Sequence, residues 1–480
     1  MIDFAMENYQ KMLSPSVDQK LVSKLLPITS KIEGEDFFNY FKRLKDSAKK
    51  GSVYKGYEEF VKHLDYVVQL LSSDQKKKIE SAVIELLPAF KIQKAIYLES
   101  LAKWLVWNKW YKKAIKVYQE LIDFKPGNEE AYFDCAQVEC ILGLCDIEGK
   151  TYQNLLNIDP LHSLARKALE RQNIRSNPSV DLMHWYWKEE GRDDLAQITR
   201  NRTDLALDIP IFCRYHLRIV GHRWLEDPQS KSGSFAANGH TLGFNGILSP
   251  HIKLETGWTN KNYTDEEFRT RDTGYAYVWF NLRDHALLGL GYDKTNELYN
   301  YFGIKQGIQA DSWWISGALN ITRQLEIELK TKYLDYKDHN EGNRYFVSAS
   351  YQFTDHPRIF KITLSGKYLD TERTSLFKYE GDTLIDIIHP YWAPESHKAG
   401  NIIFEWYHDI SKFLFCGSEL HFYDLRLGYG NETENNHSVQ FEGEWHYEFY
   451  NHWIYSIKGL LHRSRDWDSE AVWAMLKYQF

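Results

Sequence analysis

The chain has no long apolar run. No window of its 480 residues approaches 18 consecutive apolar residues, and the mean hydropathy is −0.53. A membrane-spanning helix needs about 20 predominantly apolar residues, so we expect none here. A membrane-spanning β-strand escapes this test, because only every second residue of such a strand has to face lipid.

The short motifs of common catalytic centres are also missing. The sequence contains no GxSxG, no HExxH and no Walker-type phosphate loop, so nothing points to a serine hydrolase, a zinc protease or a nucleotidase. Glu442 and Glu444 could mimic a glycosidase pair, since alternate residues of a strand lie about 7 Å apart. That spacing is common to any acidic strand. We therefore expect no enzymatic activity, no cofactor and no metal site.

Cysteine is scarce, and positive charge is not concentrated anywhere. Residues 1–180 carry a net charge of +3 and the remainder −10, without the basic face that nucleic-acid-binding proteins show. The cysteines are odd in number, form no CxxC pair and include three at a spacing that aligns no helical face. We interpret them as small buried hydrophobic residues rather than as a metal or redox site. They are Cys135, Cys140, Cys145, Cys213 and Cys416.

The last twelve residues show the most informative pattern that is present. Between Ser469 and Phe480, one face of a strand would be wholly apolar and the other would be mixed. A strand with lipid on one side and a polar interior on the other has this pattern. The terminal Phe480 also resembles the signal by which bacterial outer-membrane barrels are handed to their assembly machinery. The apolar face consists of Val472, Ala474, Leu476, Tyr478 and Phe480.

The same alternation continues for much of the chain. After Asn177-Pro178 the period changes from 3.6 to 2, and we count sixteen candidate strands joined alternately by tight turns and longer polar loops. Fourteen strands result if one hairpin is miscounted. Thirteen of the sixteen Trp lie after residue 180, which suits aromatic girdles at the membrane surfaces. We predict a linker over residues 179–202 and an antiparallel transmembrane β-barrel over residues 203–480.

The apolar sets of these strands assign an interior face. A soluble sandwich would show the same alternation with the faces reversed, but the strand number, the aromatic content and the terminal Phe480 favour the barrel. We predict a wet, charged and partly acidic lumen, in which many charges pair across strands. The predicted polymer path consists of Asp204, Asp208, Arg214, Arg218, Glu326, Glu328, Glu405, Glu419, Glu442, Glu444 and Glu448.

The first part of the chain has a helical period. Residues 1–94 are predicted to form amphipathic helices, with divergent repeats as an alternative. In residues 95–178, Pro126 and Pro160 lie 34 residues apart, which is the tetratricopeptide period. We predict tetratricopeptide-like repeats with a capping helix there, and such repeats are scaffolds that bind proteins or polymers. The fold class is therefore an α + β multidomain protein, with helical repeats before a β-barrel.

Helical repeats followed by a sixteen-stranded barrel resemble the outer-membrane exporters of bacterial exopolysaccharides, such as those for poly-N-acetylglucosamine and cellulose. The stretch GRDDLAQI looks like the segment that opens cellulose-exporter barrels, and YWAPE is similar to a Tyr-aromatic-Ser-Pro motif late in those barrels, with Ala393 in place of Ser. The matching residues are Gly191, Arg192, Asp193 and Leu195 in the first stretch, and Tyr391, Trp392 and Pro394 in the second.

This resemblance implies a function. The barrel would lie in the outer membrane, in contact with its lipid, and pass a polysaccharide chain from the periplasm to the cell surface. The repeats would lie in the periplasm and collect the chain from an inner-membrane synthase, or dock a periplasmic modifying enzyme. The N-terminus, MIDFAMENYQKML, shows no basic-then-apolar leader, and we expect the leader to have been removed or lost from this sequence.

Two other functions fit the same architecture. The chain also resembles the surface lipoprotein assembly modulators, which join helical repeats to a barrel and translocate proteins. A general porin whose repeats anchor a complex is the third possibility. Titration of the repeats against oligosaccharides and lipoproteins would separate the first two, and conductance for small solutes would support the third.

Overall fold

The computed structural model describes residues 94–480, except residues 194, 229–233, 266, 267, 269, 298, 414, 419 and 451. The predicted helices before residue 94 lie outside the described residues, and so does Glu419 of the predicted polymer path. The chain divides into two compact units, Met1–Tyr132 and Phe133–Phe480.

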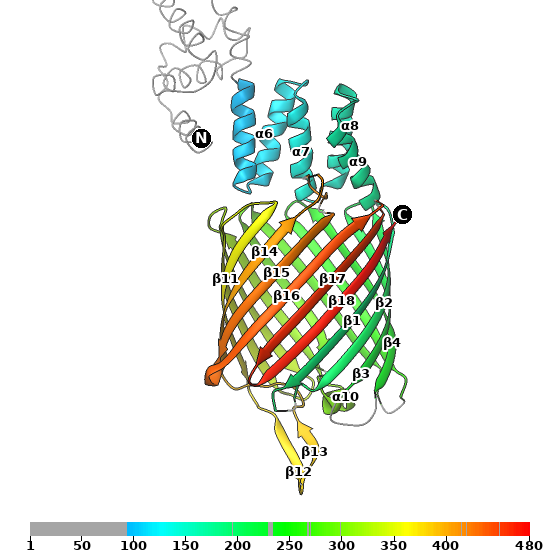
Figure 1. Cartoon of the computed structure of the whole chain (residues 1–480), viewed down its shortest axis with the longest axis vertical. Coiled ribbons are helices and arrows are strands. Elements are labelled where there is room, and N and C mark those ends of the chain that lie inside the picture. Colours follow the sequence, from blue (N-terminus) through cyan, green and yellow to red (C-terminus); the bar gives the residue numbers. More distant parts are fainter. Residues whose placement is uncertain are drawn as a thin grey trace, which may run out of the picture. The chain divides into compact units, whose positions relative to one another are not determined.

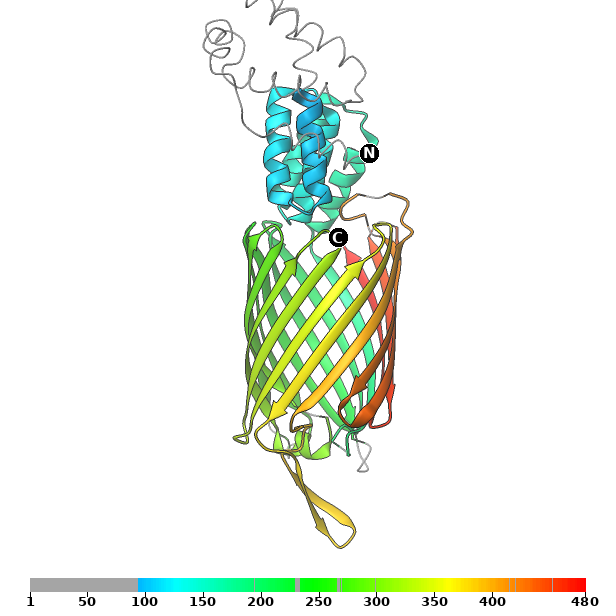
Figure 2. The ribbon, with the colours of Figure 1, turned by 90° about the vertical axis from the view of Figure 1, so that its left-hand side faces the viewer.

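Sixteen antiparallel strands of the described chain close into a barrel (Figures 1 and 2). The first strand closes the ring against the last, and β11 pairs with β14 across an insertion. Closure leaves no unpaired sheet edge, which is the condition for a sheet that spans a membrane. The barrel strands are β1 Ser179–Gly191, β2 Ile198–Ile211, β3 Tyr215–Asp227, β4 Phe235–Ser249, β5 Ile252–Tyr263, β6 Arg271–Arg283, β7 Ala286–Asn296, β8 Gln309–Asn320, β9 Leu325–Tyr336, β10 Glu341–Gln352, β11 Arg358–Thr371, β14 His397–Asp409, β15 His421–Glu432, β16 Asn436–Phe449, β17 Trp453–Ser464 and β18 Trp467–Gln479.

The connections divide the barrel into a short-turn end and a long-loop end. The chain enters β1 and leaves β18 at the short-turn end. Helix α10 (Tyr301–Gln306) follows β7 at the long-loop end, and the two-stranded hairpin of β12 (Leu376–Glu380) and β13 (Thr383–Ile388) follows β11. The hairpin projects beyond the barrel, as Figure 1 shows. A single 3₁₀ turn, η1 (Thr433–Asn435), joins β15 to β16.

The predicted strand number of sixteen is confirmed, but one barrel strand was missed and one predicted strand does not belong to the barrel. The barrel begins at Ser179, within the predicted linker over residues 179–202, so β1 was missed. Residues 383–388 were counted as a barrel strand and instead form β13 of the projecting hairpin. The charges of Lys188, Glu189 and Glu190 interrupt the alternation in β1, which hides its period of two.

The outer surface of the barrel is apolar, as predicted. Leu205, Leu329 and Leu364 are 59%, 59% and 56% exposed, whereas Asp204, the neighbour of Leu205, is 2% exposed. This is the reverse of a soluble sheet protein, which buries its leucines. The leucines therefore meet lipid, where a lysine or arginine would cost about 2–4 kcal/mol at the bilayer midplane. In the described part of the chain, no helix is long and apolar enough to cross a membrane.

Helices precede the barrel. In the first unit, residues 94–107 form a helix and α6 spans Tyr111–Phe124, with Trp104 and Trp110 packed edge to face at 5.4 Å. The helices α7 (Glu129–Ile141), α8 (Cys145–Ile158) and α9 (Ser163–Arg175) follow. The part of this helical segment that belongs to the second unit, residues 133–175, is called the cap below. The tetratricopeptide-like character of these helices stays a prediction.

Candidate functional site: the lumen and its two ends

Aromatic side chains line one side of the lumen. Residues two apart in a strand share a face, so the registers show which rings point inward. Trp185 of β1 lies opposite Trp473 of β18, and the Trp187 ring lies 6.2 Å from each of the other two. The series continues around the wall on β3, β6 and β8, and is called the aromatic arc. Its members are Trp473, Trp187, Trp185, Trp224, Tyr275, Tyr277, Trp279 and Trp314.

Glycines on neighbouring strands allow these rings to lie along the wall. A Cβ atom at Gly257 would come within 2.6 Å of the Tyr275 ring, and one at Gly291 would come within 2.3 Å of the Trp314 ring. A larger residue at either position would push the ring into the bore. Because the Tyr275 and Trp314 rings each cover a glycine on one side, their other sides are turned toward the lumen. Flat aromatic faces of this kind suit the apolar faces of sugar rings.

Cationic side chains accompany the arc. The Lys330 Nζ atom lies 4.8 Å from the Trp314 ring centroid, and the Lys458 Nζ atom lies 5.8 Å from that of Trp473. Such cation–π contacts hold the ammonium groups against the wall. The arc thus offers N–H donors next to apolar faces, which is what a hydroxyl-rich ring requires.

The predicted polar residues of β2 and β3 are mostly paired with each other in the wall. The carboxylate of Asp204 lies 2.6 Å from His222 Nδ1 and accepts a hydrogen bond of 2.7 Å from Arg202 Nε. Asp208 lies 2.7 Å from His216 Nδ1. These two carboxylates stiffen the barrel wall and are not free to contact a passing chain. Arg218 donates to Asp181 at 3.0 Å in the same way.

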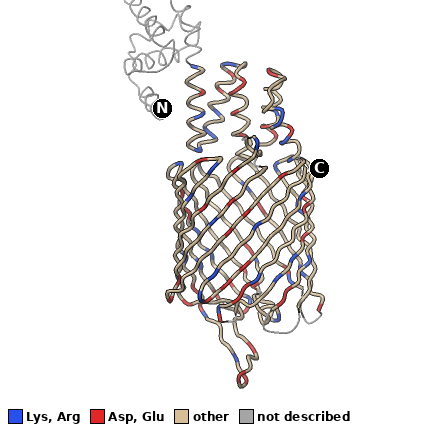
Figure 3. Tube along the Cα trace, in the orientation of Figure 1, with Lys and Arg blue, Asp and Glu red and all other residues tan. Residues whose placement is uncertain are grey.

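A second group of predicted residues surrounds one arginine on the far side of the lumen. Arg426 of β15 lies 3.4 Å from Glu405 and 3.8 Å from Glu442, on the two neighbouring strands. Lys361 and Lys458 add further ion pairs to these carboxylates, at 2.8 and 3.6 Å. Charges of both signs are interspersed over the whole barrel (Figure 3). The lumen is charged, as predicted, but its carboxylates are largely neutralised.

Three predicted carboxylates are exceptions. Glu326 and Glu328 of β9 and Glu444 of β16 lie on the lumen-facing registers, and no ion pair to them occurs among the described residues. They remain candidates for contacts with a solute. They are distributed around the bore, so the structure does not gather the predicted residues into one site.

The long-loop end of the lumen is filled by three loop segments, called the plug. It consists of Leu195, α10 and residues 387–393. Ile304 of α10 packs against the lumen-facing rings of Trp224 and Tyr263, and Tyr391 stacks on Tyr336 of β9 at 4.1 Å. The amide of Asn300 ties the segments together by donating to the carbonyls of Leu195 and Pro390, at 3.0 and 3.1 Å. The plug therefore lies inside this end of the barrel and packs against its lumen-facing wall.

The GRDDLAQI and YWAPE motifs lie close together at the plug, although they are about 200 residues apart in sequence. The Arg192 guanidinium lies 3.8 Å from the centroid of the Trp392 ring, and Leu195 shares a hydrophobic cluster with Trp392. Gly191 has φ +116°, and a Cβ there would meet the Asp466 carbonyl at 2.3 Å, so a glycine is required. Asp193 and Pro394 lie in the same loops.

Hydrogen bonds to the β9–β10 loop hold the YWAPE motif in place. Tyr391 is 1% exposed, and its hydroxyl donates to Asp338 at 3.0 Å and accepts from the Asn340 amide at 3.0 Å. His389 Nδ1 lies 2.7 Å from the other oxygen of Asp338. The hydroxyl of Tyr391 thus satisfies its hydrogen bonds entirely within the loops, which explains why a tyrosine rather than a phenylalanine suits this position.

Two disulfides bind the cap to the short-turn end. Cys140 of α7 is bonded to Cys416 in the β14–β15 connection, and Cys145 of α8 is bonded to Cys213 in the β2–β3 turn. Cys135 is a buried free thiol, and burial raises its pKa. The interpretation of the cysteines as small hydrophobic residues was wrong for four of the five. Their pairing joins residues 276 and 68 positions apart, which spacing along the sequence does not reveal.

The cap crosses the opening instead of lying beside it. Its two anchor points are separated by six of the sixteen strands. Arg171 of α9 forms an ion pair with the lumen-facing carboxylate of Glu448, which is therefore occupied by the cap. Arg214 was predicted to face the lumen, but it lies in the β2–β3 turn and pairs with Asp146 of the cap at 2.5 Å. Both residues hold the cap on the rim.

One ionisable pair lies inside the cap. Glu148 of α8 is 1% exposed, and its carboxylate lies 3.1 Å from the guanidinium of Arg175 on α9. Burial raises the pKa of Glu148 to about 7, although the charge of Arg175 opposes the shift. The cap therefore contains a carboxyl group that titrates near neutral pH.

Comparisons with known proteins give similarity of structure only. No known protein family and no curated protein sequence matches the chain. Among solved structures, the chain is similar to a bacterial polysaccharide outer membrane secretin, with 11% identity and a TM-score of 0.49 over 64% of this chain and 99% of that one. It is also similar to OccK5 (OpdH) of Pseudomonas aeruginosa, with 9% identity and a TM-score of 0.33 over 63% of this chain and 98% of that one.

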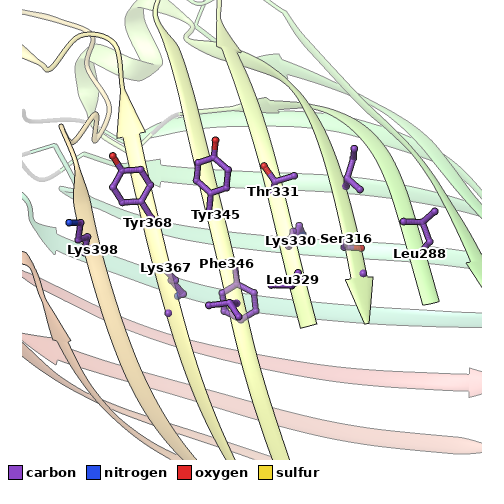
Figure 4. A pocket seen from close by; sticks show the side chains of 14 residues that line it. Leu288, Ser316, Leu329, Lys330, Thr331, Tyr345, Phe346, Lys367, Tyr368 and Lys398 are labelled. Carbon is purple, nitrogen blue, oxygen red and sulfur yellow. The ribbon is translucent and has the colours of Figure 1, made fainter. Parts of the chain in front are cut away.

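A large hollow on the barrel lies outside the lumen. It measures about 720 Å³ and follows strands β7 to β14 (Figure 4). Most of its lining residues, including Leu329, Tyr345 and Tyr368, belong to the lipid-facing registers, and Gly317 and Gly366 provide the depth. Acyl chains fill such a surface in a membrane, so this hollow is not part of a route through the barrel.

The sequence interpretation missed the aromatic arc. It assigned the tryptophans to interfacial girdles, which fits Trp258 and Trp313, since these are 45% and 49% exposed on the outer surface. It placed Trp473 on the inner face of its strand. It did not assign Trp185 and Trp187 to the inner face of β1, because it took residues 179–202 for a linker. Recognition of β1 would have brought these three rings together.

Proposed function

We propose that the chain is an outer-membrane channel that passes a polysaccharide from the periplasm to the cell surface. The short-turn end and the cap would face the periplasm, and the long loops would face the outside, which is the usual orientation of bacterial barrels. The helices before the barrel would act as tetratricopeptide-like repeats that receive the chain from an inner-membrane synthase or dock a modifying enzyme. Catalysis is not required of this protein.

The aromatic arc is the observation that carries this proposal. Eight rings follow the inner wall on β18, β1, β3, β6 and β8, with lysine and arginine groups beside them. Aromatic faces combined with N–H donors can contact the apolar face and the hydroxyls of successive sugars. A route through a channel needs contacts that are favourable enough for entry and weak enough for exit, and repeated shallow contacts meet both conditions.

The plug favours a gated exporter over a general porin. A porin conducts small solutes continuously, whereas here Leu195, α10 and residues 387–393 fill the long-loop end with buried side chains. The plug would move when a chain passes. The projecting hairpin of β12 and β13 is attached to the same loop as Tyr391, so that loop has a part outside the barrel by which it could be displaced.

The test compares lumen-facing with lipid-facing tryptophans. Trp187→Ala combined with Trp473→Ala should reduce the polysaccharide recovered outside the cells by several-fold and increase the amount retained in the periplasm. Trp258→Ala combined with Trp313→Ala removes the same atoms from the outer surface and should leave export unchanged. Heat-modifiable migration on gels confirms that each variant contains a folded barrel.

The outcomes separate the alternatives. Equal export by both double variants would contradict the proposal. Loss of a surface lipoprotein in the lumen variant, with polysaccharide unchanged, would support the protein translocon. High conductance of the wild-type protein for small solutes in planar bilayers would support the porin.

A further inference from the structure

A pocket of about 400 Å³ lies in the lumen beneath the plug. Its walls come from β1, β2, β3, β5, β6 and β7, including Asn296 at the end of β7, and its remaining side comes from Tyr299 in the connection from β7 to α10. A ligand in this pocket would contact the rigid wall and the plug together. The volume is within the range of small-molecule sites, and fits roughly one or two sugar rings.

Aromatic rings and hydrogen-bonding groups alternate around the pocket. Arg202 lies between two rings of the arc, with its guanidinium 5.6 Å from Trp185 and 5.4 Å from Trp224. Thr259 and Thr273 contribute hydroxyl groups. A Cβ atom at Gly239 would lie 3.0 Å from the Trp224 ring, so this ring also lies against a glycine of the wall. The pocket therefore presents ring faces next to donors and acceptors.

Apart from Arg200 and Lys294, the charged side chains that line the pocket are compensated in pairs. Lys261 donates to Glu226 at 2.7 Å, and Asp293 is held by Lys332 at 2.8 Å. Arg202 is paired with Asp204. A pocket with compensated charges gains little from binding an ion, since the ion would compete with existing partners. A neutral, hydroxyl-rich ligand fits this arrangement better.

Arg200 has hydrogen-bonding capacity that the protein does not use. Its Nε and Nη2 atoms are buried and have no hydrogen-bond partner, and its nearest carboxylate oxygen, on Glu226, lies 3.9 Å away. Its guanidinium lies 5.0 Å from the Tyr299 ring of the plug connection. A buried donor without a partner costs free energy, and a ligand hydroxyl at the junction of wall and plug would remove that cost.

We propose that this pocket is a binding subsite for a neutral saccharide, which it holds against the closed plug. The inference rests on the proposed function, since it names the class of sugar that the channel recognises. A ligand stabilises the state to which it binds more tightly. Because Tyr299, in the connection to α10, forms part of the pocket only while the plug is in place, a short saccharide bound there stabilises the closed channel.

The first experiment measures binding to the full-length protein in detergent. Cello-oligosaccharides and fully N-acetylated chito-oligosaccharides, which are neutral, should quench tryptophan fluorescence saturably, and an oligogalacturonate of equal length should bind more weakly. Trp185→Ala should raise the Kd of the neutral sugars about 3- to 10-fold, the effect of losing one aromatic contact. Trp258→Ala is the matched control. This tryptophan of β5 is 45% exposed on the outer surface and does not line the pocket, so the Kd of its alanine variant should equal that of the wild type.

The second experiment measures the plug. In planar bilayers, the neutral oligosaccharide should lower the frequency of channel openings in the wild type and in Trp258→Ala, but not in Trp185→Ala. Equal Kd values for the two variants, tighter binding of the oligogalacturonate, or more frequent openings with sugar would each overturn the inference. A protein that exports polysaccharide but shows one of these results refutes the subsite alone. A protein that binds the sugars as expected but exports none refutes the proposed function.

Discussion

The covalent attachment of the cap provides the sharpest test of the structure. Residues 176–178 connect α9 to β1, so a protease site inserted there would cut the only backbone link between the cap and the barrel. In the wild type, the two fragments should stay together on a non-reducing gel and separate after reduction. Removal of one disulfide, by Cys140→Ser with Cys416→Ser or by Cys145→Ser with Cys213→Ser, should still leave them joined. Only the variant that lacks all four cysteines should separate without reductant.

The structure also sets the size of the effect on cap docking. With the barrel folded, the Cys140–Cys416 bond closes a loop of roughly 40 residues back to the start of β1, and the chain-entropy relation gives about 4 kcal/mol for a loop of that length. Loss of this bond alone should thus increase transient undocking by up to about a thousand-fold, but the second disulfide limits the increase. Hydrogen exchange of α8 and α9 measures it.

Two results would refute this reasoning. The first is separation of the cleaved wild-type fragments without reductant, which would show that the disulfides do not form. The second is a different pairing, such as Cys140 with Cys213, in mass spectra of the cross-linked peptides. Either result would remove the evidence that the cap crosses the opening. The two disulfides also require an oxidising compartment, in which such bonds persist.

Three further predictions follow from other parts of the molecule. Burial raises the pKa of Glu148 to about 7, so the folded cap keeps a proton that the unfolded chain loses above its ordinary pKa of 4.5. The stability of the cap should therefore fall as the pH rises from 4.5 to 7, by up to about 3 kcal/mol. Glu148→Gln should abolish this pH dependence in thermal unfolding measurements. Replacement of residues 297–308 by a short Gly-Ser turn should open the plug and raise single-channel conductance, whereas unchanged conductance would show that α10 does not close the channel. Glu442→Gln with Glu444→Gln should reduce polymer export without affecting barrel assembly, and normal export would exclude an acidic path.

The alternation of apolar and polar side chains was enough to predict the barrel. In a membrane barrel the apolar face of a strand meets lipid instead of a protein core, but apolar residues still occur at every second position. Val472 and Leu476 were assigned to lipid from parity alone, and both are exposed on the outer surface. The same reasoning failed for β1, in which three charged residues follow one another near the long-loop end. There the strand leaves the hydrocarbon region, so lipid no longer dictates which residues are apolar.

Other features depend on contacts that no local pattern encodes. The disulfides join turns of the barrel to helices, and the plug brings together Arg192 and Trp392, which lie about 200 residues apart in the sequence. The motif residues were recognised by resemblance, but their shared location was not predicted. Only the structure gives a physical reason for two of them. Gly191 lies in a turn that leaves no room for a side chain, and the hydroxyl of Tyr391 belongs to a buried hydrogen-bond network.

Glu448 shows why a lumen-facing position does not by itself identify a path residue. Its parity in β16 is the same as that of Glu442 and Glu444, and sequence reasoning treated the three alike. In the structure, Glu448 forms an ion pair with Arg171 of the cap. Glu442 forms ion pairs with basic residues on the two neighbouring strands, and no ion pair to Glu444 occurs among the described residues. Removal of one partner from a buried pair leaves an uncompensated charge, so Glu448→Gln should loosen the cap, whereas Glu444→Gln should affect only a solute in the bore. Undocking of the cap measured by hydrogen exchange should therefore respond to Glu448 and not to Glu444, although the two lie on one face of the same strand.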